Sequence, residues 1–146
     1  MTKTKKLEYE KYIEQLVTRL AEYFNLAGWT IETEFDAPAK TDLGDGAYAY
    51  ALVDSTYQRI KLFFTQKVRE EYVSGDVYRP SEAAVHEMVH AFLDPFHEWA
   101  LTYLSEANSP DFRRILEQQT QKLTMVFMKS LVSELGLKYG LNKYPR

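Results

Sequence analysis

Hydrophobic side chains recur every three or four positions near the start of the chain, with glutamates and lysines between them. This pattern predicts an amphipathic helix over residues 7–26, because the apolar side chains then share one face. The helix is expected to stop within residues 25–28, since Gly28 tolerates the left-handed backbone that ends many helices. The apolar stripe consists of Leu7, Ile13, Leu16, Val17, Leu20 and Phe24.

After this helix the hydrophobic period changes from about four to two. The alternation predicts a half-buried strand over 29–35, followed by a loop over 36–46 that is rich in Gly, Asp and Pro. Two further strands are expected at 47–53 and 57–64, because β-branched and aromatic residues alternate there with polar ones. Together the three strands predict a small, mostly antiparallel sheet.

The remainder of the chain has helical patterns. Pro80 and the acidic residue two positions later, Glu82, are typical of a helix start. Pro95 lacks the amide hydrogen that a helix interior needs, so a break is expected there. The expected helices are 65–73, 80–94, 96–106 and 111–135. A helix, three strands and then helices predict an α+β fold in a single domain spanning residues 1–146.

Composition narrows the possible partners. The chain has 146 residues, and 18 basic against 21 acidic side chains give a formal net charge of −3, without the basic excess typical of nucleic-acid-binding proteins. Cysteine is absent, which excludes disulfides, thiolate metal ligands and cysteine nucleophiles. No apolar stretch approaches the roughly 18 residues that span a membrane, and the first residues lack the apolar core of a secretion signal. We expect a soluble cytoplasmic protein that binds neither nucleic acid nor membranes; its oligomeric state is not predicted.

The segment His86-Glu87-Met88-Val89-His90 matches the motif HExxH within a predicted helix. Residues four apart share a helix face, so the two imidazoles can bind one Zn²⁺ at roughly 2.0–2.1 Å each. Glu87 lies about 100° around the helix from His86, beside the metal and not on it. There it can accept a proton from a water whose pKa zinc lowers to around 7, and pass it to a leaving amine.

The alternative to a metal site is a chance motif on a metal-free helical scaffold. Apolar residues surround the two histidines, which predicts that this helix is largely buried. Buried imidazoles need polar partners, and a metal ion is one. The motif therefore favours a zinc site. The surrounding residues are Val85, Met88, Val89, Phe92 and Leu93.

A catalytic zinc ion usually has three protein ligands and one open position. The metzincin extension of the motif is absent, because Leu93 replaces the required Gly and Phe96 the required His. His97 comes one residue too late. Asp94 would continue the face of His90 by one turn, so it is one candidate for the third ligand.

Glu117 is the preferred candidate for the third ligand. At helical spacing it shares a face with the small and apolar residues Thr120, Thr124, Phe127 and Leu131. A carboxylate that continues such a stripe is expected to point inward, where it requires a partner. The alternative is a solvated glutamate that is favoured in the first turn by the helix dipole.

The sequence resembles the small phage- and prophage-encoded HExxH metallopeptidases, which look like minimal zincins of the gluzincin type. The resemblance rests on residues 28–31 after a helix, the strand 58–62, the helix start at 80–82, the segment 86–90, and a glutamate that opens a later helix. It implies a zincin-like fold, with a sheet over an HExxH active-site helix and a long C-terminal glutamate helix. It also implies His86, His90 and Glu117 as zinc ligands and Glu87 as the general base.

Two functional hypotheses follow. The first is a zinc metallopeptidase that acts on a peptide or protein substrate, whose strand adds to the edge of the sheet beside residues 57–64. Its oxyanion-stabilising residue stays open among His97, Tyr103, Tyr139 and Tyr144. The second is a catalytically weak or inactive zinc-binding module of phage origin, with an interaction or regulatory role.

Overall fold

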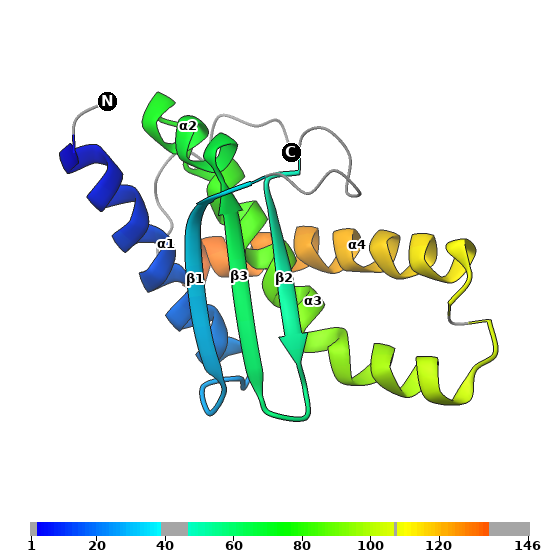
Figure 1. Cartoon of the computed structure of the whole chain (residues 1–146). Coiled ribbons are helices and arrows are strands. Elements are labelled where there is room, and N and C mark those ends of the chain that lie inside the picture. Colours follow the sequence, from blue (N-terminus) through cyan, green and yellow to red (C-terminus); the bar gives the residue numbers. More distant parts are fainter. Residues whose placement is uncertain (1–2, 39–46, 107, 135–146) are drawn as a thin grey trace.

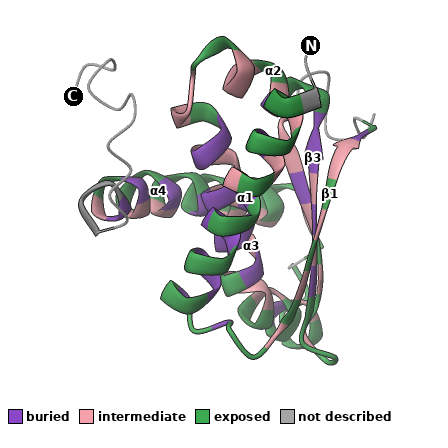
Figure 2. Cartoon of the chain, turned by 90° about the vertical axis from the view of Figure 1, so that its left-hand side faces the viewer, coloured by how far each residue is buried: buried purple, intermediate pink, exposed green. Residues whose placement is uncertain are grey.

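The computed structural model describes residues 3–38, 47–106 and 108–134. Seven elements follow one another in the chain, and their bounds are α1 Lys3–Tyr23, β1 Thr30–Ala37, β2 Ala49–Asp54, β3 Arg59–Thr65, α2 Gln66–Ser74, α3 Tyr78–Tyr103 and α4 Pro110–Glu134. The helices pack on one face of a three-stranded sheet, which gives two layers (Figure 2). The predicted α+β class is confirmed.

The strand order in the sheet is β1-β3-β2. β1 runs parallel to β3, and β2 runs antiparallel to it, so the pairing is mixed where we had expected mostly antiparallel strands. β3 is the central strand and is hydrogen-bonded on both sides. The prediction that a substrate strand pairs beside residues 57–64 is therefore wrong, because that strand has no free edge. β2 has one.

The core lies between the sheet and the helices. Ile60, Leu62 and Phe64 alternate along β3 and are at most 1% exposed, as their period of two predicts. They belong to one hydrophobic cluster with residues of α1 and α3, including Leu20 and Val89. This packing fixes α3 against the sheet, and α3 carries the HExxH motif.

α1 ends three residues earlier than predicted, and the residue that ends it is not the glycine. Asn25 adopts a left-handed backbone with φ 57°, and the amide of Leu26 donates to the carbonyl of Ala21 at 2.7 Å. Asparagine is the residue that replaces glycine most readily in this conformation. Gly28 has no positive φ and lies beyond the turn.

α3 continues through Pro95 as one helix, so the predicted break into two helices is wrong. An internal proline removes one hydrogen bond and costs roughly 3 kcal/mol in an isolated helix. Tertiary packing offsets that cost here. Beyond Pro95, the ring of His97 stacks on Phe112 of α4 with centroids 6.2 Å apart, and Ala100 is fully buried.

In the described part of the chain, no helix combines the length and the hydrophobicity that crossing a membrane requires. The single domain, the cytoplasmic location and the absence of a nucleic-acid partner stay predictions, because nothing in the fold tests them.

Candidate metal centre

The start of α3 is set by Asp76, whose carboxylate accepts hydrogen bonds from the amides of Tyr78 and Arg79 at 2.9 and 3.2 Å. Such an acceptor satisfies amides that have no partner within the helix. Tyr12 and Ser81 join their hydroxyls at 2.5 Å and so connect α1 to the same turn. The helix that presents the two histidines is thereby held at its first turns.

Glu117 reaches the two histidines from α4, which returns alongside α3 after the turn that joins them (Figure 1). Its Oε1 lies 3.0 Å from Nε2 of His86, and its Oε2 lies 3.1 Å from Nε2 of His90. The two Nε2 atoms are 3.2 Å apart. The three residues that sequence reasoning named as ligands form a group that can hold a metal ion.

These distances are compatible with one metal ion bound by all three residues. A tetrahedral ion with bonds of roughly 2.0–2.1 Å separates its ligand atoms by about 3.3 Å. Here each Nε2 atom lies 3.0–3.1 Å from one of the two carboxylate oxygens, and the two Nε2 atoms are 3.2 Å apart. Two imidazoles and one carboxylate are a ligand set typical of catalytic zinc sites.

The charges of the three groups depend on one another. Burial lowers the pKa of His86, but the hydrogen bond to Glu117 and the nearby carboxylates of Glu87 and Glu82 outweigh burial, so the pKa is raised. The hydrogen bonds from His86 and His90 hold the pKa of Glu117 well below its usual range. Glu117 is therefore ionised at neutral pH, as a carboxylate ligand must be.

Two buried threonines of α4 lie behind His86. The hydroxyl of Thr124 donates to the carbonyl of Thr120 at 2.8 Å, which leaves its oxygen free to accept. That oxygen lies 3.4 Å from Nδ1 of His86. If Nδ1 keeps its hydrogen when the ring is neutral, the lone pair of the imidazole is on Nε2, the atom that faces Glu117. Metal-binding histidines commonly have such a partner on their other nitrogen.

Glu87 lies beside the group and is not part of it. Its side chain is 7% exposed, and burial raises its pKa, although the two histidines act in the opposite direction. The backbone amide of Ala51 in β2 donates a hydrogen bond to its carboxylate. Glu87 therefore connects α3 to the free edge of the sheet, and a raised pKa makes its carboxylate a stronger base.

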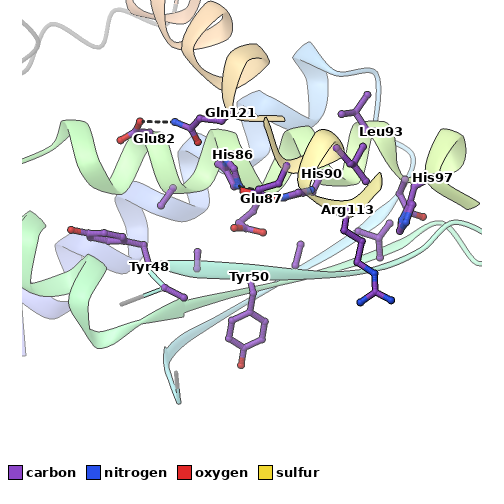
Figure 3. Close-up of a pocket in the computed structure, with 18 of the residues that line it drawn as sticks. Tyr48, Tyr50, Glu82, His86, Glu87, His90, Leu93, His97, Arg113 and Gln121 are labelled. Carbon is purple, nitrogen blue, oxygen red and sulfur yellow. Dashed lines mark hydrogen bonds and ion pairs between the residues drawn. The ribbon is translucent and has the colours of Figure 1, made fainter. Parts of the chain in front are cut away.

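The group lies in an open cleft of about 910 Å³ between β2, α3 and the first turns of α4. Figure 3 shows His86, Glu87 and His90 at its middle, with Tyr48, Glu82 and Gln121 toward one end and Leu93, His97 and Arg113 toward the other. The space is large enough for a few residues of an extended peptide.

Other candidates from the sequence lie elsewhere. Asp94 lines the cleft but is outside the metal-binding group, and its carboxylate accepts a hydrogen bond from Ser55. His97 lines the cleft, whereas Tyr103 is 70% exposed and does not line it. Tyr139 and Tyr144 lie outside the described residues.

Glu117 differs from its prediction in one respect. Thr120 and Thr124 are fully buried on the same face, but the side chain of Glu117 is 57% exposed. Glu117 lies at the end of this face of α4, where the buried residues stop and the cleft begins. Sequence reasoning missed the role of Thr124, although the helical spacing placed it in the stripe. The amide of Ala51 carries no signal in the sequence, because every residue except proline has one.

Comparisons of the chain with protein-family models, curated proteins and solved structures found no match. The likeness to zincins therefore rests on the metal-binding group alone. Two histidines four residues apart on α3 and a glutamate on α4 are compatible with a zincin-like metal site.

Proposed function

We propose that this protein is a zinc-dependent metallopeptidase. The observation that carries the proposal is the convergence of His86, His90 and Glu117 within 3.0–3.2 Å at the middle of an open cleft, with the buried carboxylate of Glu87 beside them. The described residues contribute three ligands to this group, the number typical of catalytic zinc.

The ligand residues would hold Zn²⁺ through two imidazole nitrogens and one carboxylate. When bound, such an ion acidifies water and polarises a carbonyl group. The hydroxyl of Thr124 would accept a hydrogen bond from Nδ1 of His86, so that the other nitrogen stays available as a ligand. Glu117 brings a negative charge that compensates part of the charge of the ion.

Glu87 acts as the general base in this proposal. Its carboxylate accepts the proton of the attacking water and later donates it to the nitrogen of the leaving amine. Burial raises its pKa, which strengthens the carboxylate as the base that accepts the proton of the water. The hydrogen bond from Ala51 keeps the carboxylate oriented toward the cleft.

The substrate peptide would bind in an extended conformation along β2. That strand is at the edge of the sheet and lines the cleft with Ala49, Ala51 and Val53. Peptides commonly bind proteins by adding a strand to such an edge, with backbone hydrogen bonds that are independent of sequence.

The decisive experiment uses purified wild-type protein and Glu87→Gln, both loaded with zinc, against a library of fluorogenic peptides. We expect equal zinc content and loss of hydrolysis by at least a hundredfold in the variant. Hydrolysis that is retained in Glu87→Gln would refute the role of Glu87, and an inactive zinc-loaded wild type would favour a binding or regulatory module.

A further inference from the structure

The two ends of the cleft differ in how their charges are paired. At the end near Tyr48, the guanidinium of Arg79 pairs with Glu82 at 3.3 Å, and Gln121 donates to the same carboxylate at 3.5 Å. At the opposite end, the cleft is lined by Asp94, His97, Arg113 and Arg114. Asp94 is engaged by Ser55, and His97 is stacked on Phe112.

Arg113 is the residue of interest at this opposite end. It lies four residues before Glu117 on α4 and therefore on the same face, about 6 Å along the helix axis. Its side chain extends from α4 across the cleft toward the sheet (Figure 3). Among the described residues, its guanidinium has no carboxylate within ion-pair distance, whereas that of the neighbouring Arg114 contacts Asp111 at 3.5 Å.

We propose that Arg113 binds a carboxylate of the substrate. This inference rests on the proposed peptidase function and specifies its substrate class. Arg113 lies at one end of the cleft whose middle holds His86 and Glu87, so a peptide bound along β2 would bring residues close to the cleaved bond within its reach. The planar guanidinium fits a carboxylate with two parallel hydrogen bonds.

Two sources supply this chemistry. One is the side chain of an aspartate or glutamate close to the cleaved bond, and the other is the α-carboxylate at the C-terminus of a short peptide. Both place one negative charge at the same end of the cleft. Peptides that differ by a single group distinguish them.

The test measures kcat/KM of the zinc-loaded protein on matched peptides. For each position within three residues of the cleaved bond, one pair of peptides differs only by Glu or Gln. A further pair differs only in having a free or an amidated C-terminus. We expect Arg113→Gln to reduce kcat/KM about tenfold to a hundredfold for the acidic member of one pair, because a hydrogen-bonded charge is lost. The neutral member should change less than about twofold, because it offers the guanidinium no charge to bind.

Matched variants separate charge from geometry. Arg113→Lys keeps the charge without the planar fork and should retain part of the preference for the acidic peptide. Lys122→Gln removes one positive charge from an exposed position of α4 outside the cleft and should leave the preference unchanged. An equal loss on acidic and neutral peptides in Arg113→Gln would overturn the inference, as would a wild type without preference.

A binding measurement distinguishes failure of this inference from failure of the peptidase function. Zinc-loaded Glu87→Gln is titrated with the same fluorescent peptides, alone and combined with Arg113→Gln. Tighter binding of the acidic peptide that disappears with Arg113 supports the carboxylate site even if no peptide is cleaved. Equal binding of both peptides overturns it, whatever the activity of the wild type.

Discussion

The hydroxyl oxygen of Thr124 lies 3.4 Å from Nδ1 of His86, on the side of the ring away from Glu117. The two residues come from different helices and are both turned into the space between α3 and α4. We predict that Thr124→Val lowers zinc affinity about tenfold to a hundredfold, the range typical of outer-shell partners of metal-binding histidines. Competition with a fluorescent zinc chelator measures the change.

Thr124→Ser is the control, because serine keeps the hydroxyl and loses only a methyl group. It should bind zinc nearly as tightly as the wild type. If the serine variant loses as much affinity as the valine variant, packing of the methyl group and not the hydrogen bond positions His86.

Replacement of the ligands themselves should abolish stoichiometric binding. His86→Ala and Glu117→Ala each leave two of three ligands, so zinc should be lost during dialysis, whereas Asp94→Ala should retain it. Metal content after purification without an affinity tag measures this. Zinc that is retained in Glu117→Ala and lost in Asp94→Ala would assign the third ligand to Asp94.

The stability of the metal-free protein and the affinity of the protein for zinc should change with pH in opposite directions. The pKa of His86 is raised above 6.5, so its contribution to stability is complete below about pH 6.5 and is lost as the pH rises through the folded-state pKa. The pKa of Glu117 is lowered from 4.5, so its contribution is present above about pH 4.5 and is lost on acidification. The interactions of His86 with Glu117 should therefore stabilise the metal-free protein most between about pH 4.5 and pH 6.5.

Zinc binding requires neutral imidazoles, so its affinity should rise as the pH increases from 6 to 8, with release of protons. Urea denaturation of the chelator-treated protein and calorimetric zinc titrations in buffers of different ionisation enthalpy measure the two effects. An affinity for zinc that does not depend on pH in this range would contradict histidine ligation.

Pro95 offers a prediction about stability. Alanine at this position restores the amide that can donate to the carbonyl of Ala91, and it removes the steric conflict of the ring within α3. We expect Pro95→Ala to raise the free energy of unfolding by about 1–2 kcal/mol, less than the helix propensity alone suggests, because proline also restricts the unfolded chain. Equilibrium urea denaturation measures it. A loss of stability would show that the packing of His97 on Phe112 needs the proline.

The elements with strong periodicity were predicted well, because burial of one face is a local property of the sequence. The strand β3 is an example, since Ile60, Leu62 and Phe64 face the core as their spacing indicates. Strand pairing depends on contacts far apart in sequence, and the parallel pairing of β1 with β3 was not predicted. The continuity of α3 past Pro95 was missed for the same reason, since contacts with α4 outweigh the local cost of proline.

The site was predicted to the extent that side-chain chemistry and helical spacing determine it. His86, Glu87 and His90 follow from a motif within five residues, and Glu117 follows from its stripe on α4. The contribution of Ala51 is a backbone amide, and that of Arg113 depends on which end of the cleft it enters. Neither is encoded by residue type alone.

The group of His86, His90 and Glu117 joins two helices, and Glu117 comes 27 positions after His90 in the chain. A bound ion would act there as a cross-link in a protein without cysteine. Closing a loop of this length with a disulfide contributes about 3–4 kcal/mol, mainly by restricting the unfolded chain. The metal would thus do for the hairpin of α3 and α4 what a disulfide does in secreted proteins, and the same ion that supports catalysis would hold the two helices together.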